Sequence, residues 1–318
     1  MRSRLVQLIR ASLLHAVVIT MAQQASAQGI ADPVRHPVIA IDGGNFCEAP
    51  NWTLVFADEF NGDELDTDKW LRFYPYCWNQ EDCLYSRTHG WPRDMAIYKD
   101  ENVQMTGHGT VKIIARKGPV EQWYTASSTY TSGILHSRFK FGRGRFECRC
   151  KVPKSTSHYL WPAFWLFGGN DACSEIDILE ITADPSNHYH HALHRYNPTC
   201  DGIDASEEGT MKLHDLSDDF HVYRVDWDMW FVNFYIDDAL VHRSCRMYDL
   251  LNRPVSDCEV PGGIFIQNQA FPAQDAELSI IVGMGIHDGL YVNALGGPAT
   301  IPDLPATLEI DYVRVYQH

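Results

Sequence analysis

The 318-residue chain has few basic side chains, with 26 Lys and Arg against 41 Asp and Glu and a formal charge of −15. A protein that binds nucleic acid needs a basic face, and a membrane-surface module needs a polybasic segment. The charge balance therefore argues against both classes. Apolar residues are plentiful at 45%, which is enough for a sizeable core and too much for a disordered chain.

Long apolar runs and metal-binding cysteine pairs are also missing. After residue 27, no run is long and apolar enough to cross a membrane as a helix. The nine Cys include no Cys-x-x-Cys pair, which argues against a structural zinc site. We therefore expect no membrane span and no structural zinc site. Separately, we expect no cofactor for catalysis.

The N-terminal segment has the pattern of a secretory signal peptide. In residues 1–27 a basic stretch and a short apolar stretch precede Ala25-Ser-Ala27, a small-x-small cleavage signal. We therefore expect a secreted or periplasmic protein. Residues 28–50 carry Pro and Gly without a period and are predicted to be a leader or linker.

An exported chain permits disulfides, and an odd number of Cys leaves at least one unpaired within the chain. Cys148 and Cys150 alternate along a predicted strand and are expected to be buried core residues. Three other pairs are candidates for loop-closing or segment-tying bridges: Cys77–Cys83, Cys245–Cys258 and Cys173–Cys200.

Helical periodicity, repeats and composition breaks are absent from Trp52 onward, so we treat residues 51–318 as one domain. Phe231 to Val241 resembles a hairpin with Asp237-Asp238 as its turn. Short strands without crossover helices predict an all-β antiparallel sandwich or barrel. The runs that predict strands alternate and are rich in β-branched and aromatic residues: 111–115, 145–150, 220–227, 232–236 and 308–316.

The most informative segment is Glu175-Ile-Asp-Ile-Leu-Glu180. Positions i and i+2 of a strand share a face, so Glu175 and Asp177 point one way while Ile176 and Ile178 point into the core. Glu180 is an odd step away and would face the core in a regular strand. One extra residue in a β-bulge returns it to the acidic face, which predicts a bulge here.

Three converging carboxylates have a chemical consequence. Crowded like charges raise at least one pKa, so one acid stays protonated near neutral pH while another is ionised. Cleavage of a glycosidic bond needs such a pair. The alternative for three acids in six residues is a solvated acidic face on an edge strand.

Further motifs accompany the acids along nearly the whole domain, and together they resemble glycoside hydrolase family 16, the laminarinase-like retaining β-glycanases. The Glu-x-Asp-x-x-Glu spacing is that of the bulged branch of this family. The motifs are Asp58-Glu-Phe-Asn-Gly62, Leu65-Asp-Thr-Asp-Lys-Trp70, Tyr130-Thr-Ser-Gly133, Gly144-Arg-Phe-Glu-Cys-Arg149, Trp161-Pro-Ala-Phe-Trp165, Phe220-His-Val-Tyr223 and Asp311-Tyr-Val-Arg-Val-Tyr316.

The resemblance implies a fold and a mechanism. The fold would be a β-jelly-roll sandwich, concanavalin A-like, with a concave substrate cleft. Glu175 matches the nucleophile, Glu180 the acid/base, and Asp177 the residue that orients and tunes the nucleophile. Double displacement would follow, with carboxyls about 5–5.5 Å apart.

The resemblance also implies substrate-binding residues: His194 lies where the family places a cleft His, and Trp165 and Trp161 would stack on sugar rings. Core packing is the alternative for either Trp. The neighbouring His188, His190 and His191 are expected at the surface. A transition-metal site is a weaker alternative for this His cluster, because its spacing matches no usual zinc pattern.

Many family members hold a structural Ca²⁺ on the convex side. The matching positions here are Glu59, the Gly109 carbonyl and Asp311, whose oxygens suit Ca²⁺. The alternative for the two acids is an ordinary turn or edge position.

Two stretches depart from laminarinases and leave the substrate open. Residues 278–289 lack the usual Asn and Trp-Pro, and Asn170-Asp-Ala-Cys-Ser174 replaces another Trp-Pro. We expect an endo-acting hydrolase, a monomer, whose partner is a polysaccharide: β-1,3-glucan or β-1,3/1,4-glucan. The alternatives are a galactan (agar, porphyran or carrageenan), a transglycosylase and a non-catalytic sugar-binding protein. The acidic balance speaks weakly against sulfated substrates.

Overall fold

The computed structural model describes most of the predicted domain. The signal peptide predicted at residues 1–27 lies outside the described part. No helix within that part is long and apolar enough to cross a membrane. The described residues are 38–45, 47, 51–75, 83–89, 94–154, 159–181, 188–200, 202–287 and 304–318.

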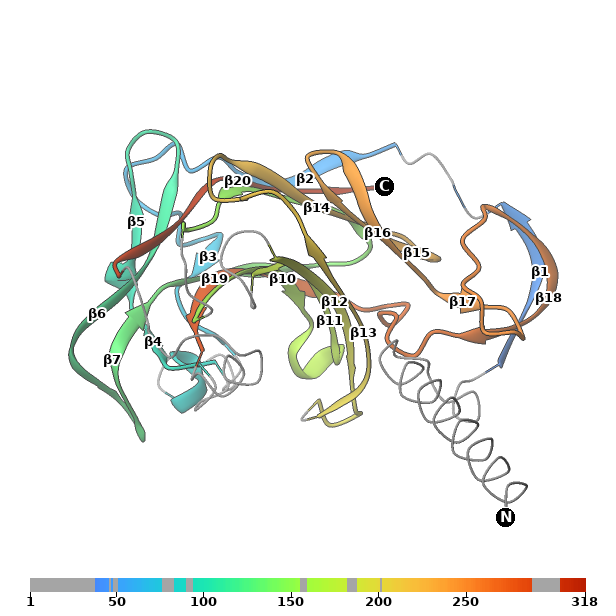
Figure 1. Cartoon of the computed structure of the whole chain (residues 1–318), viewed down its shortest axis with the longest axis horizontal. Coiled ribbons are helices and arrows are strands. Elements are labelled where there is room, and N and C mark those ends of the chain that lie inside the picture. Colours follow the sequence, from blue (N-terminus) through green and yellow to red (C-terminus); the bar gives the residue numbers. More distant parts are fainter. Residues whose placement is uncertain are drawn as a thin grey trace, which may run out of the picture.

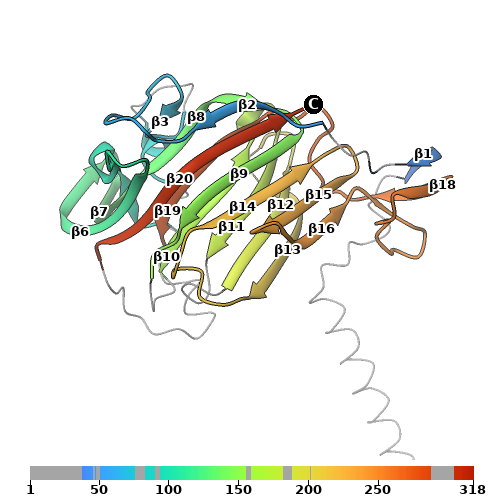
Figure 2. The same ribbon diagram turned by 90° about the horizontal axis from the view of Figure 1, so that it is seen from above.

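Two large sheets pack face to face, as Figures 1 and 2 show. The seven-stranded sheet has the order β13 (Ile203–Lys212), β12 (His188–Tyr196), β11 (Ser174–Ile181), β10 (Leu160–Phe167), β19 (Leu278–Ile286), β8 (Ile134–Phe141) and β3 (Trp70–Leu71). Its face that points away from the other sheet is called the site face below.

The ten-stranded sheet forms the second layer. Among the described strand pairs of the molecule, only β4 with β7 is parallel, so the predicted antiparallel sandwich is confirmed. Its order is β16 (Ala239–Cys245), β15 (Phe231–Ile236), β14 (His221–Trp227), β9 (Gly144–Lys151), β20 (Ala306–Gln317), β6 (Val111–Trp123), β7 (Ala126–Ser132) and β4 (Ala96–Tyr98), with β2 (Thr53–Asp58) on β20 and β5 (Val103–Met105) on β6.

The main core lies between the two sheets. Tyr189 of β12 stacks on Tyr223 of β14 with ring centroids 6.4 Å apart, so the two layers meet there. Along β9 every second side chain is buried, because alternate residues of a strand face opposite sides. Cys148 and Cys150 fall on the buried side, which confirms their predicted place in the core.

Within the described ranges there are also three short 3₁₀ helices and a tight hairpin. The helices are Leu84–Ser86, Asp100–Asn102 and Gly169–Asp171. The predicted hairpin is confirmed as β15 and β16. Asp237 and Asp238, at its turn, have φ of 48° and 65°, the left-handed geometry that matches strand twist in a two-residue turn.

A smaller sheet of three strands stands beside the sandwich, in the order β1 (Val38–Asn45), β18 (Glu259–Gln267) and β17 (Met247–Tyr248) (Figure 1). Part of the segment predicted as a leader therefore forms a strand. β1 pairs antiparallel with β18 from Val38–Ile266 to Asn45–Glu259. A loop-like sequence can still supply a strand, because backbone pairing needs no particular side chain.

The disulfides agree with the sequence only in part. Cys173–Cys200 is confirmed. Cys258 bonds to Cys47 instead of Cys245, so the predicted Cys245–Cys258 bridge is wrong, and Cys245 is a buried thiol. Pairing of β1 with β18 brings Cys47 next to Cys258, which spacing along the chain could not reveal. Cys83 is disulfide-bonded, and Cys77 lies outside the described residues.

Candidate active site

The acidic strand β11 carries the predicted bulge. Its register shifts against β10, where Leu179 faces Phe164 but Asp177 faces Trp165. A shift also occurs against β12, between Asp177 and Glu180. Ile178 and Leu179 are consecutive, yet both belong to the core between the two sheets, which regular alternation would not allow. The extra residue returns the last acid to the site face, as predicted.

Glu180 is held on the site face by two neighbours. The indole N–H of Trp161 donates a hydrogen bond of 2.7 Å to Glu180 Oε1. His190 Nε2 lies 3.6 Å from the other oxygen, Oε2. Indole is only a donor, so Oε1 must accept, and a proton on Glu180 sits on Oε2. The acid proton therefore has a defined place.

Glu175 receives a hydrogen bond from a residue that sequence reasoning missed. The hydroxyl of Tyr196 donates to Glu175 Oε2 over 2.8 Å. Glu175 also shares a side-chain hydrogen bond with Asp177, and two carboxyls can do so only with a proton between them. Tyr196 lies two residues beyond the cleft His, and its strand position is the one signal that could have found it.

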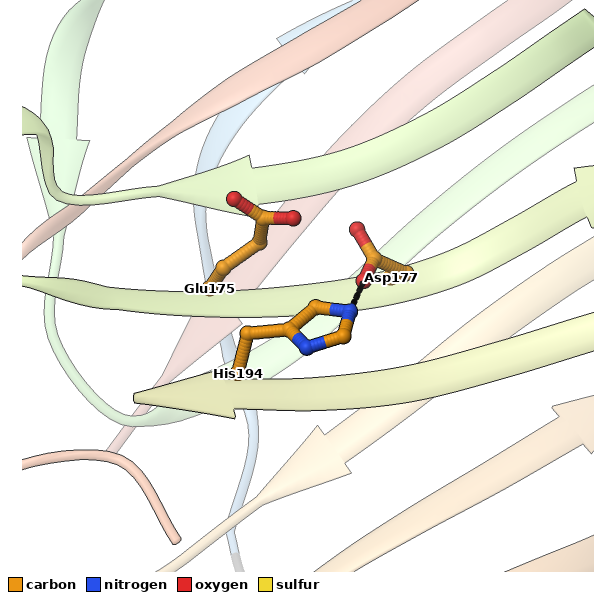
Figure 3. A group of neighbouring side chains, drawn as sticks. All are labelled: Glu175, Asp177 and His194. Atoms are coloured by element: carbon orange, nitrogen blue, oxygen red, sulfur yellow. Dashed lines mark ion pairs between the residues drawn. The ribbon is translucent and has the colours of Figure 1, made fainter. Parts of the chain in front are cut away.

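Asp177 lies between the two glutamates and faces a histidine. Figure 3 shows Glu175, Asp177 and His194 converging from the neighbouring strands β11 and β12. His194 Nε2 is 3.2 Å from Asp177 Oδ2. On the other side of the ring, Nδ1 lies 4.0 Å from Glu208 of β13. The predicted cleft His is therefore brought to the acids.

Burial and mutual repulsion raise the pKa of all three carboxyls. Burial raises the pKa of Glu180 to about 7, and the charge of Glu175 adds to the effect. Burial, then the charge of Asp177, raises the pKa of Glu175 to about 8. Burial and the charge of Glu180 raise the pKa of Asp177 well above its usual value. The group therefore retains protons near neutral pH.

Geometry alone would let one cation approach this group. Ligand atoms of Glu175, Asp177 and His194 lie within 4.8 Å of one another. Their mutual contacts and the Tyr196 hydroxyl already account for the arrangement, so we assign no metal to it.

Two tryptophans of β10, Trp161 and Trp165, lie beside the acids. The Trp161 ring stacks on His287 with centroids 4.3 Å apart. Trp165 is 7% exposed and packs against Tyr74 and His89. Both predicted Trp therefore stand on the site face. Trp161 is the more accessible of the two.

The three remaining histidines of β12 do not share one environment, and the surface prediction for them is wrong for His191. That ring is 3% exposed and packs against Phe234 and His242 in the inter-sheet core. Alternation explains this, because His190 and His194 take the site face and His191 takes the other. His190, expected at the surface, instead contacts Glu180.

The residues predicted for Ca²⁺ have other partners. Both oxygens of Glu59 accept hydrogen bonds of 2.8 Å from the Arg314 guanidinium. Asp311 accepts one of 2.5 Å from Arg149. Gly109 has a φ of +84° in the neighbouring turn. As arranged, the two carboxylates are neutralised by arginine, so this donor set does not fit a calcium ion without displacing both.

The model of the family described as glycosyl hydrolases family 16 matches residues 93–265. The chain belongs to this family. A beta-glucanase of Rhodothermus marinus is 29% identical over 287 residues, covering 85% of this chain and 87% of that protein.

Two further known proteins are similar over most of the chain. A glucan endo-1,3-beta-glucosidase of Cryptopygus antarcticus is 26% identical over 280 residues, covering 83% of this chain and 91% of its own. The X-ray structure of the laminarinase from Rhodothermus marinus has a TM-score of 0.60 and 26% identity, and it covers 85% of this chain and 99% of its own. The jelly-roll sandwich is therefore the family 16 fold.

Proposed function

We propose that this family 16 protein is an endo-acting, retaining β-glycanase that hydrolyses β-1,3-glucan or β-1,3/1,4-glucan. The observation that carries the proposal is the convergence of Glu175 and Glu180 on one strand, each with its own hydrogen-bond donor. The names of the relatives, a beta-glucanase and a glucan endo-1,3-beta-glucosidase, support the glucan.

In the proposed first step, Glu175 attacks the anomeric carbon while the bond to the leaving oxygen breaks. Glu180 gives its Oε2 proton to that oxygen, and a glycosyl-enzyme forms on Glu175. In the second step Glu180 takes a proton from water, whose oxygen displaces Glu175. These steps use only carboxyls of the chain and need no cofactor.

The order of the pKa values needs an explanation in this mechanism. The pKa of Glu175, about 8, stands above that of Glu180, about 7, although the nucleophile must be ionised. The hydrogen bond between Glu175 and Asp177 itself acts to raise the pKa of Glu175 and to lower that of Asp177, so it favours the proton on Glu175 before substrate binds. Because one proton serves both carboxyls, its transfer to Asp177 frees Glu175 for attack. With the proton on Asp177, Glu175 is ionised and accepts a hydrogen bond from the Asp177 carboxyl. We therefore propose Asp177 as the residue that tunes the nucleophile.

The charges near the acids favour a neutral polysaccharide over a sulfated one. The charged groups that act most strongly on the three carboxyls are one another, Glu208 and His194, and none of these is Lys or Arg. A sulfated galactan would bring further negative charge beside these carboxyls, where the described charges that act on them most strongly include no guanidinium or ammonium. The proposal therefore places porphyran and carrageenan behind glucans. Trp161 and Trp165 would bind the sugar rings.

We also propose that the protein is secreted or periplasmic. The predicted signal peptide leads to this, and disulfides such as Cys173–Cys200 support it, because they persist in oxidising compartments.

The test is product analysis on laminarin, lichenan, agarose, porphyran and κ-carrageenan, with Glu175→Gln as the inactive control. We expect new reducing ends from laminarin or lichenan, with mid-length fragments first. Redistribution of chain lengths without new ends would indicate a transglycosylase. Release from porphyran or carrageenan would overturn the substrate. Binding without turnover on the whole panel would overturn the activity.

A further inference from the structure

Tyr196 contacts the proposed nucleophile from the end of β12. Its hydroxyl donates to Glu175 Oε2 over 2.8 Å. Burial, then the charge of Glu175, raises the pKa of Tyr196 far above the working range, so the hydroxyl stays protonated and can donate to the Glu175 carboxylate.

The backbone aims this side chain diagonally across the strand pair. His194 faces Glu175 directly in the register, and Tyr196 is the next residue along on the same face. Against β13 the register shifts between Arg195 and Tyr196, with Asp204 as the extra residue on β13, so the last pair of β12 is Tyr196 with Ile203. Phe167 of β10 meets the Tyr196 ring edge-on, with centroids 5.6 Å apart.

A disulfide fixes the place where this tyrosine leaves the sheet. The Tyr196 N–H donates to the Cys173 carbonyl over 2.9 Å, and Cys173 is bonded to Cys200 in the turn that follows β12. Both cysteines have a positive φ, 47° and 56°, a region that non-glycine residues adopt at a cost. The bridge therefore joins two residues with strained backbone conformations, one in the segment before β11 and one in the turn after Tyr196.

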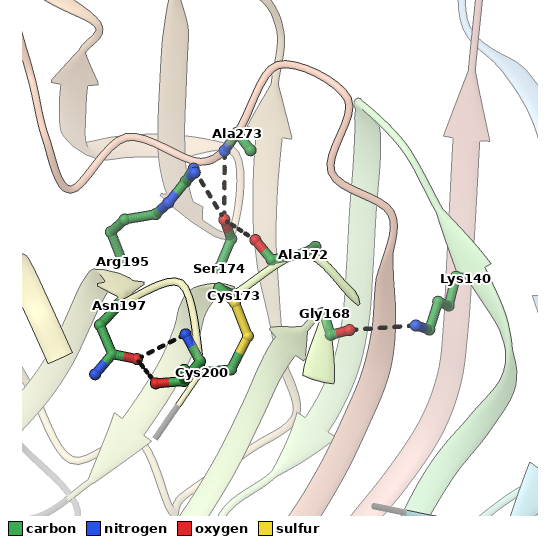
Figure 4. The surroundings of a disulfide bond; sticks show 10 residues. Lys140, Gly168, Ala172, Cys173, Ser174, Arg195, Asn197, Cys200 and Ala273 are labelled. Carbon is green, nitrogen blue, oxygen red and sulfur yellow. Dashed lines mark hydrogen bonds between the residues drawn. A yellow bond between two sulfur atoms is a disulfide. The ribbon is translucent and has the colours of Figure 1, made fainter. Parts of the chain in front are cut away.

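Hydrogen bonds around the bridge fix the first residues of β11 as well. Figure 4 shows Ser174 between the disulfide and the loop of Ala273. The Ala273 N–H donates to Ser174 Oγ over 3.3 Å, and that hydroxyl donates to the Ala172 carbonyl over 3.1 Å. Cys173 lies in the stretch 170–174 that departs from laminarinases. The departure thus supplies a covalent support directly before the nucleophile.

We propose that Tyr196 is a positioning residue for Glu175, and that the Cys173–Cys200 disulfide fixes Tyr196 in place. The inference rests on the proposed function, since it assigns Glu175 the attacking role. A donor on one carboxylate oxygen restricts rotation of the carboxylate and directs the other oxygen to the sugar.

The first test is Tyr196→Phe, which keeps the ring against Phe167 and removes only the hydroxyl. Losing a hydrogen bond to a charged group predicts a fall in kcat of about 10- to 100-fold. KM on the polysaccharide that the wild type hydrolyses should change little. Unchanged kcat, or a higher KM at unchanged kcat, would overturn the positioning role.

The second test separates the disulfide from general stability. Cys173→Ala/Cys200→Ala should lower kcat, and adding Tyr196→Phe should lower it no further, because both changes release the same contact. Removing the distant bridge with Cys47→Ala/Cys258→Ala is the matched control and should leave kcat unchanged. Losses that multiply in the triple variant would overturn the link between bridge and tyrosine.

Two further points keep the outcomes separate. Cys200→Ser alone leaves β11 unaltered and replaces the double variant if that protein fails to fold. A wild type without turnover on any glycan contradicts the proposed function. A wild type that turns over at the same kcat as Tyr196→Phe contradicts only this inference.

Discussion

The indole N–H of Trp161 and Oε1 of Glu180 form a 2.7 Å hydrogen bond between neighbouring strands. The donor favours the ionised carboxylate, so it lowers the pKa of Glu180 against the burial that raises it. This contact sets how far into the alkaline range the proposed general acid keeps its proton.

The pH profile should report this contact. Since Glu180 must be protonated and its pKa is about 7, kcat/KM should fall as pH rises through neutrality. Trp161→Phe removes the donor, so the alkaline limb should move up by about one pH unit. Trp165→Phe is the control and should leave the limb in place, whatever it does to KM. An unmoved limb in Trp161→Phe would contradict the assignment of Glu180 as the acid.

Replacing the acids should abolish activity without unfolding the protein. Glu175→Gln and Glu180→Gln should each lower kcat by roughly a thousand-fold or more, because a nucleophile or acid is lost. In the folded state the pKa of Glu180 is raised from 4.5 to about 7, so wild-type stability falls as pH rises through this window. Glu180→Gln should therefore gain up to about 3 kcal/mol above pH 7, measured by urea unfolding.

Glu101→Gln is the control for that pH effect, because its effect on the free energy of unfolding should have the opposite sign. Glu101 is exposed, and its hydrogen bond to Lys99 lowers its pKa. Its contribution is present above its unfolded pKa and is lost as pH falls through the folded value. Glu101→Gln should therefore be slightly less stable than the wild type at neutral pH. If Glu101→Gln and Glu180→Gln change the free energy of unfolding equally at every pH, burial does not destabilise the ionised form of Glu180.

The anomer released first tests the mechanism independently of the substrate. Two displacements at one carbon restore its configuration, so a β-linked polysaccharide should release the β anomer. Proton NMR in the first minutes of digestion distinguishes this from later mutarotation. Early appearance of the α anomer would mean that Glu175 and Glu180 do not act as the proposed pair.

Gly209 of β13 makes room for the buried His191. A Cβ at this position would lie 2.6 Å from two atoms of the imidazole ring. Gly209→Ala should lower the free energy of unfolding by about 1–3 kcal/mol through overpacking. In a His191→Ala background the same change should cost much less. Gly118→Ala, with nothing within 4 Å, is the matched control; equal costs at the two glycines would remove the steric explanation.

Calcium at Glu59, Gly109 and Asp311 stays a prediction from the resemblance. Since each carboxylate already pairs with an arginine, the ion must displace Arg314 and Arg149 to bind. We therefore expect the same Tm by calorimetry in Ca²⁺ and in EDTA. A Tm raised by Ca²⁺ in the wild type, but not in Asp311→Asn, would support the predicted calcium site.

The sequence predicted the acidic strand well because its signal is local. Alternation placed Glu175 and Asp177 together, and the odd spacing of Glu180 required a bulge, which the register shows. The hairpin at Asp237-Asp238 followed from the same kind of reasoning. Such patterns depend only on residues a few positions apart.

The contacts that the sequence did not reveal join distant segments. Cys47 and Cys258 are separated by 211 positions, and only the pairing of β1 with β18 makes them neighbours. His190 and His191 are adjacent in sequence yet serve opposite faces, which the strand bounds decide. Tyr196 reaches Glu175 across the pairing of β11 with β12, two residues beyond the direct partner His194. These contacts depend on strand pairing and on exact strand bounds, which periodicity alone does not give.

The bridge between Cys47 and Cys258 also bears on how the protein can be produced in shortened form. The region matched by the family model includes Cys258 but begins after Cys47. A recombinant fragment cut to that region would lose β1 from the small sheet and β2, β3, β19 and β20 from the two large sheets. Strands such as β18 and β10 would then have open hydrogen-bonding edges, and Cys258 would be a solitary thiol. Open edges recruit other strands, and free thiols in oxidising medium cross-link chains. Such a fragment is set to aggregate even though every proposed catalytic residue is present.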